Sequence, residues 1–90
     1  MEDHPEVRLT YWHLNRNNIE QLWFYSVEDV AERIFDHCRR LPDTERVTFC
    51  VEHWRDDGVA LMQAHGTPRR MLALYGWPEN LMLHLAAGRK

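Results

Sequence analysis

Hydrophobic and polar residues alternate with two different periods along this chain, and the clearest helical period covers residues 26–41. Apolar side chains in this segment recur three and four residues apart, at Val27, Val30, Ala31, Ile34, Phe35, Cys38 and Leu41. This spacing is typical of an amphipathic α-helix that packs one face on a core. Ser26 is in position to cap the first turn, and Pro42 ends the segment.

The rest of the chain alternates with a period of two, which is typical of β-strands. Asparagine-rich and Asp-Gly turns separate the alternating segments. We expect strands over residues 7–14, 19–25, 47–55, 59–65, 70–75 and 81–86. The segment 81–86 also fits a short terminal helix, because periodicity does not separate the two in so short an apolar run.

Together these elements predict a single α+β domain over residues 1–90, with frayed ends at 1–6 and 87–90. The expected order is β-β-α-β-β-β-β. It gives an antiparallel sheet of about five to six strands that is packed on one face by a single helix. The expected core joins the sheet to the helix through Val47, Phe49, Val51, Val30, Ile34, Phe35 and Cys38. In this arrangement, Phe35→Ala costs ~3–5 kcal/mol of unfolding free energy.

The charge balance disfavours a protein that binds nucleic acid or a membrane. Fourteen acidic residues exceed eleven basic ones, whereas a protein that binds phosphate backbones usually carries net positive charge. The acidic N-terminal sequence is not typical of a secretory signal, and no run approaches the ~20 apolar residues of a membrane span. Cys38 on the helical stripe and Cys50 inside a strand resemble small buried hydrophobic residues, which is typical of a reducing compartment. We therefore expect a cytoplasmic protein.

The chain offers few residues for catalysis. Its one serine is the expected helix cap, and its one lysine is Lys90, so a serine nucleophile and a P-loop are both disfavoured. His37 and Cys38 are neighbours on a helix, where side chains point ~100° apart and cannot form a nucleophile–base pair. The six histidines lack the spacing of metal ligands. We expect no catalytic residue, no metal and no cofactor.

Two predicted turns combine the residue types that dominate protein-binding surfaces. Tryptophan and arginine supply most of the binding energy at such surfaces, and carboxylates at their rim steer a basic partner. We predict that the partner-binding residues are Trp54, Arg55, Asp56, Asp57, Trp77 and Glu79. The alternative is that the tryptophans pack over the ends of the sheet while the acids are simply solvated.

Three other interpretations remain open at this stage. The arginine doublets at 39–40 and 69–70 could contact nucleic acid in a small regulator. A pocket between the helix and the sheet could serve a small enzyme or a ligand-binding domain. Sheet edges without lysine could pair two copies of the chain into a homodimer.

The order of elements resembles that of small α+β immunity proteins of bacterial polymorphic toxin systems. The segments that carry the resemblance are SVEDVAERIFDHCRRL, VTFCVEHW, DDG, VALMQAHG and RRMLALYG. They cover about half of the chain and match in element type. The resemblance implies a cytoplasmic inhibitor that binds another protein, such as a toxin or a defence or host protein, without performing chemistry.

Overall fold

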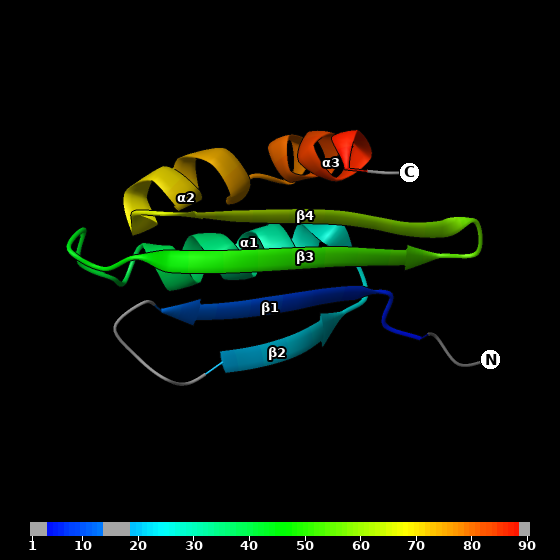
Figure 1. The fold of residues 1–90 in the computed structure, drawn as a ribbon, viewed down its shortest axis with the longest axis horizontal. Coiled ribbons are helices and arrows are strands. Elements are labelled where there is room, and N and C mark those ends of the chain that lie inside the picture. The colour runs from blue at the N-terminus through cyan, green and yellow to red at the C-terminus, as the bar shows by residue number, and fades with distance from the viewer. Residues whose placement is uncertain (1–3, 14–18, 89–90) are drawn as a thin grey trace.

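Four strands form one antiparallel sheet in the computed structural model, which describes residues 4–13 and 19–88. The elements are β1 (Val7–His13), β2 (Ile19–Phe24), α1 (Val27–Cys38), β3 (Val47–Arg55), β4 (Gly58–Gly66), α2 (Pro68–Tyr75) and α3 (Pro78–Ala87). The strand order is β2-β1-β3-β4, and the helices pack against one another on one side, with α1 behind β3 and β4 in Figure 1. None of the described helices is long and apolar enough to cross a membrane.

The prediction of five to six strands and a single helix is wrong. Residues 70–75 lie in α2 and residues 81–86 in α3, so the described part of the chain has four strands and three helices. Proline begins both helices: Pro68 follows the cap Thr67, whose side chain accepts a hydrogen bond from the Arg70 N–H, and Pro78 follows Trp77. Proline suits a first helical turn because its missing N–H has no partner there. These helix-start signals carry more information than the short apolar runs that follow them.

The first helix and the two antiparallel strand pairs are confirmed, although α1 ends at Cys38 and not at Leu41 as predicted, and the predicted asparagine turn at 15–18 lies outside the described residues. Ser26 caps α1, since its side chain accepts a hydrogen bond from the Asp29 N–H at 3.2 Å. The β3–β4 turn ends at Gly58, whose φ of +135° is one that L side chains rarely adopt. Of the ends expected to fray, residues 1–3 and 89–90 lie outside the described residues. Glu6 is tied into the sheet, because its backbone bonds to Phe24 and Trp54.

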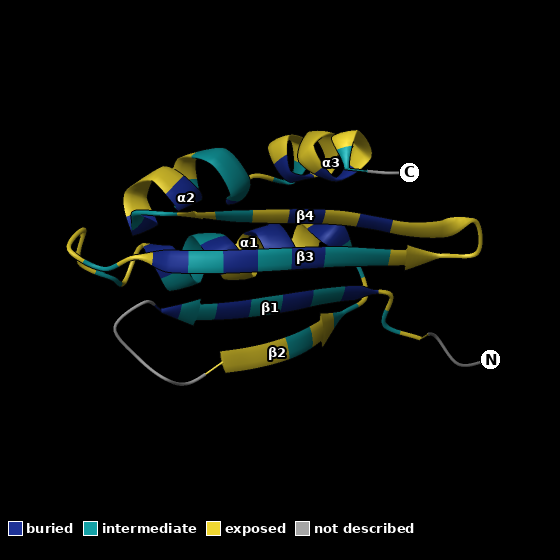
Figure 2. Cartoon of the chain, viewed as in Figure 1, coloured by how far each residue is buried: buried dark blue, intermediate teal, exposed yellow. Residues whose placement is uncertain are grey.

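The core lies between the sheet and the helices, and buried residues alternate along β1 and β3 (Figure 2). The expected contributions of Val47, Phe49, Val51, Val30, Ile34 and Cys38 are confirmed, since all six are at most 2% exposed. Phe35 departs from the prediction because it is only half-buried. Its ring packs edge-on against Trp77, with ring centroids 5.3 Å apart, so it joins α1 to the start of α3.

The two edges of the sheet differ in exposure. The end of α3 lies against the β4 edge, where a Cβ added to Gly88 would stand 1.9 Å from the carbonyl oxygen of Leu61. The other edge strand, β2, pairs only with β1. Most of its side chains are exposed. Any pairing of two copies through a sheet edge would therefore use β2 more readily than β4.

Candidate functional site

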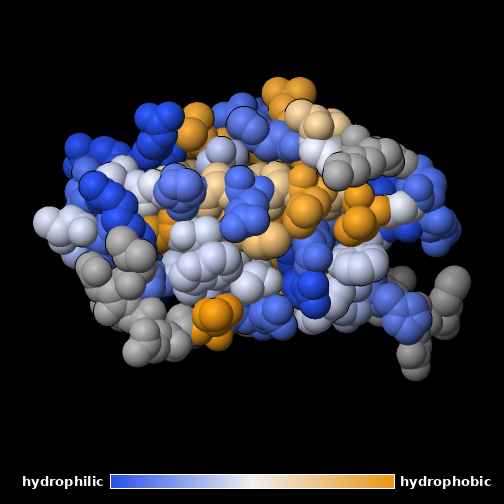
Figure 3. All heavy atoms as spheres, in the orientation of Figure 1, coloured by the Kyte–Doolittle hydropathy of each residue, from blue (hydrophilic) through white to orange (hydrophobic). Residues whose placement is uncertain are grey.

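The face of the sheet opposite the helices carries a group of exposed apolar side chains. Large hydrophobic side chains on this face are between 36% and 64% exposed, and they are Ile19, Trp23, Trp54, Val59 and Leu61. Figure 3 views the molecule from this side, and its apolar side chains lie among polar ones. We call these five residues, with Arg8 and Glu52 between them, the uncovered face.

One row of side chains crosses all four strands of the uncovered face. The register places Trp23 opposite Arg8, Arg8 opposite Glu52, and Glu52 opposite Leu61. Arg8 forms an ion pair with Glu52, and its guanidinium carbon lies 5.5 Å from the centre of the Trp23 ring. Cation–π contact and ion pairing hold Trp23 in place while they neutralise the charge in the middle of the row.

A hollow opens where β3 turns into β4. Its volume is about 620 Å³, and it is lined by His4, Pro5, Glu6, Trp23, Trp54, Arg55 and Asp56. Three of the predicted site residues therefore share one concave surface, and Asp57 follows directly in the turn. Sequence reasoning missed Trp23, because only the pairing of β2 with β1 places it on the same face as Trp54.

The other two predicted site residues lie with the helices. Trp77 precedes α3 and packs on Phe35, beside a cavity of about 300 Å³ that Glu28 and Glu32 also line. Glu79 is exposed in the first turn of α3. The six predicted residues therefore form two separate groups, one at the β3–β4 turn and one in the helical layer.

The two arginine doublets come together in the fold. Arg39 and Arg69 line one cavity of about 160 Å³ with Asp43, whose carboxylate accepts a hydrogen bond from the Arg69 N–H. Asp36 pairs with Arg39 at 2.8 Å and with Arg40 at 3.2 Å. The hydrogen bond from Arg39 lowers the pKa of Asp36. Carboxylates therefore interrupt this basic cluster, which weakens its attraction for phosphate.

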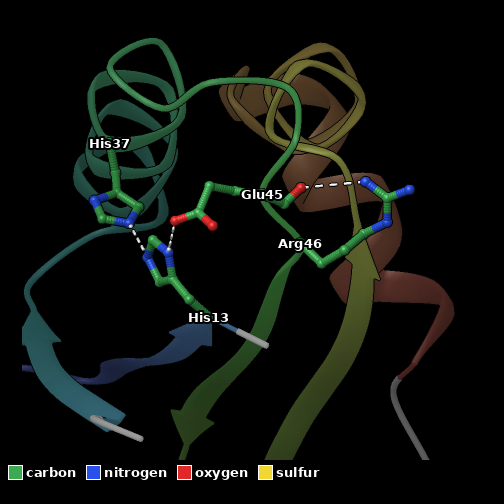
Figure 4. A network of polar contacts seen from close by, with 4 residues as sticks. All are labelled: His13, His37, Glu45 and Arg46. Carbon is green, nitrogen blue, oxygen red and sulfur yellow. Dashed lines mark hydrogen bonds and ion pairs between the residues drawn. The ribbon is translucent and has the colours of Figure 1, made fainter. Parts of the chain in front are cut away.

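A buried histidine joins three parts of the chain (Figure 4). His13 on β1 places Nδ1 at 3.3 Å from a Glu45 carboxylate oxygen and Nε2 at 3.1 Å from Nε2 of His37. Only one of the two facing nitrogens can carry the proton that bonds them. The network ties β1 to α1 and to the loop before β3. Among the described residues, no three or more His, Cys, Asp or Glu side chains are arranged to hold a metal ion.

The structure does not arrange His37 and Cys38 as a nucleophile and its base. Nε2 of His37 is directed at His13, whereas Cys38 is 2% exposed in the core. Burial raises the pKa of the Cys38 thiol to about 12. Cys50 was expected to be buried but is only partly so, because it alternates with the core residues of β3. Partial burial still raises its pKa, and the nearby Glu52 carboxylate adds to this effect. Neither thiol has the lowered pKa of a reactive cysteine.

Alkaline pH is expected to destabilise the protein through Cys38. Above the ordinary thiol pKa of about 8.5, the unfolded chain loses a proton that the folded chain keeps up to about pH 12. Stability is therefore fully present below about pH 8.5 and falls as the pH rises toward 12. Urea unfolding at pH 7, 9 and 10 should show this loss. The loss of stability at alkaline pH should be smaller in Cys38→Ala. What remains would come from other groups such as Tyr11, because burial raises the pKa of Tyr11 as well. An equal loss in both proteins would contradict the assignment.

Comparison with known proteins adds no relative. No family model, no curated protein and no solved structure matches this chain.

Proposed function

We propose that this chain is a non-catalytic protein-binding module of the immunity or inhibitor type, and that it blocks its partner through the uncovered face. One observation carries the proposal. Of the nine exposed large hydrophobic side chains in the described part of the chain, five lie on this one face of the sheet. Exposed apolar side chains that gather on one face are typical of a protein-interaction site.

Trp23 and Trp54 are the expected anchors of the interface. Each is about half-exposed, and together they flank the hollow at the β3–β4 turn. Buried tryptophans are among the residues that contribute most to protein–protein affinity. Because Arg8 is already paired with Glu52 and stacked near Trp23, the partner would cover a neutral, ordered surface and would lose little conformational entropy there.

The charge around the hollow favours a basic partner. Glu6 and Asp56 line the hollow together with one arginine, Arg55, while Asp57 follows in the turn, and the whole chain carries a net charge of −3. Complementary charge raises the association rate, and salt screens this attraction. Association should therefore slow with increasing salt while the dissociation rate changes less.

A nucleic-acid function is supported less well by the same geometry. Exposed aromatic side chains on a four-stranded sheet can stack on unpaired bases. In this chain the aromatic hollow has an acidic rim, and the arginine doublets lie with α1 and α2 instead of on the uncovered face. The stacking groups and the cationic groups therefore do not form one continuous surface.

Loss of the two anchors is expected to abolish partner binding. The chain would be co-expressed with the products of its neighbouring genes, and complexes would be measured by titration calorimetry. Trp23→Ala and Trp54→Ala should each weaken binding about 30-fold or more, as hot-spot residues do. Leu83→Ala is the matched control, because Leu83 is 69% exposed on α3 and should leave affinity unchanged.

Three results would contradict the proposal. A partner bound equally well by the Trp23→Ala/Trp54→Ala variant would use another surface. Single-stranded RNA or DNA that binds at physiological salt and depends on these tryptophans would make the face a nucleic-acid surface. A stable dimer that the double variant dissociates would make a second copy of the chain its occupant.

A further inference from the structure

A second cavity lies on the other side of the sheet, between α3 and the end of the β3–β4 hairpin. Its volume is about 290 Å³. Its apolar walls come from α1, β4 and α3, and they are Val27, Ala60, Met82, Leu85 and Ala86. Two polar residues of β3, His53 and Arg55, complete its lining. Figure 1 shows α3 above β4, on the side nearer the hairpin turn.

The two polar residues of this cavity differ in their bonding. Nε2 of His53 lies 2.6 Å from a carboxylate oxygen of Glu6, so this imidazole already has an acidic partner. The guanidinium of Arg55, by contrast, forms no hydrogen bond or ion pair with any residue of the ranges 4–13 and 19–88. The other side of Arg55 borders the hollow of the uncovered face. A guanidinium that has no partner among the described residues thus lies at the polar end of an apolar cavity.

The apolar walls and the Arg55 guanidinium together favour a ligand that has an apolar body and a carboxylate. The planar guanidinium is always charged, and it binds a carboxylate through two parallel hydrogen bonds. The five apolar side chains favour a hydrocarbon body and disfavour a polyanion such as a nucleotide, which would need several donors. Val27 is the first residue of α1, so the cavity also lies at the positively polarised end of that helix.

We propose that this cavity binds a small monocarboxylic acid, with its aromatic or aliphatic body against Met82 and Leu85 and its carboxylate on Arg55. The volume lies at the lower end of the range for small-molecule sites, roughly 300–1,000 Å³, which limits the ligand to one ring or a short chain. Arg55 borders both this cavity and the hollow beside Trp23, but the apolar walls of the cavity lie on the helical side of the sheet, so the proposal does not depend on the proposed protein-binding function.

Titration with 3-phenylpropionate tests the proposal, with amide chemical shifts followed by NMR. We expect saturable binding with a dissociation constant of about 1 mM or tighter, and shifts that centre on the cavity residues. The neutral analogue 3-phenylpropionamide should bind at least tenfold more weakly. Arg55→Gln should also weaken binding at least tenfold. Arg40→Gln, which removes an exposed arginine paired with Asp36, should leave binding unchanged.

Further variants separate this site from the uncovered face. Ala86→Leu narrows the cavity at an exposed position of α3 and should weaken binding, whereas Trp23→Ala should not. Each variant's melting curve would confirm that it is folded. The proposal is overturned if no saturable shift appears up to 10 mM acid, if Arg55→Gln binds as well as the parent, or if the amide equals the acid. Tighter binding of a pentapeptide with a free C-terminal phenylalanine would overturn the assignment to a free acid.

Discussion

Replacing Phe49 by alanine is expected to remove about 3–5 kcal/mol of unfolding free energy. Phe49 lies on β3, a central strand, and it is the largest of the fully buried side chains among the described residues. Its ring lies 6.1 Å from that of Tyr11 on the neighbouring strand. Alanine would leave a cavity between the sheet and the helices that neighbouring strands cannot close. A domain of this size has a stability on the order of 5 kcal/mol, so the variant should be partly unfolded at 25 °C.

Phe35→Ala is the matched control for this prediction. Phe35 is half-buried and packs on Trp77 at the edge of the helical layer. Loss of its ring should cost roughly 1–2 kcal/mol of unfolding free energy, because Phe35 buries less apolar area than Phe49 does. Urea unfolding followed by circular dichroism would compare the two variants. Equal losses, or a larger loss for Phe35→Ala, would mean that α1 turns a different face to the sheet.

The losses of unfolding free energy in the Leu81→Ala and Leu83→Ala variants are expected to differ by at least ~1.5 kcal/mol. Truncating a buried leucine costs ~2–5 kcal/mol, whereas truncating an exposed one costs ~0.5 kcal/mol or less. Leu81 is fully buried, whereas Leu83 is 69% exposed. This difference follows from the helix: residues 81 and 85 share one face of α3, and residue 83 points away. In a strand, residues 81, 83 and 85 would share a face, and both substitutions would have similar effects.

Thermal melting of the two leucine variants checks this prediction. Leu81→Ala should lower the melting temperature by several degrees or more, while Leu83→Ala should melt within about two degrees of the parent. A similar decrease in both variants would indicate a fifth strand, as the alternating pattern of residues 81–86 first suggested. The measurement therefore tests the element that the sequence described least well.

Most of the first two-thirds of the fold could be predicted from local patterns. The stripe from Val27 to Cys38 has a cap at Ser26, and its periodicity and cap predict the same helix. Residues 47–55 and 58–66 alternate on either side of an Asp-Gly turn, so turn chemistry and periodicity also agree there. After residue 66 the two signals disagree. The apolar runs of α2 and α3 are short, and only Thr67-Pro68 and Trp77-Pro78 mark them as helices.

The candidate sites were less predictable than the fold. Trp54, Arg55 and Asp56 are adjacent in sequence, so their residue types alone suggested a binding surface. Trp23 joins them only through the register of β2, β1 and β3, which local patterns do not specify. The cavity beside Arg55 is partly formed by α3. It could not be predicted, because residues 81–86 were expected to form a strand.

By itself, the sequence determined the position of α1, the two hairpins and the alternation of buried residues, because these depend on interactions between residues close along the chain. The tertiary structure alone decided which face of the sheet stays uncovered and where cavities form. Those features depend on how α2 and α3 pack beside α1, through contacts between residues far apart in sequence. The stripe at Val27–Cys38 accordingly packs mainly in the core, whereas Trp23 and Trp54 lie on the face of the sheet that the helices leave uncovered.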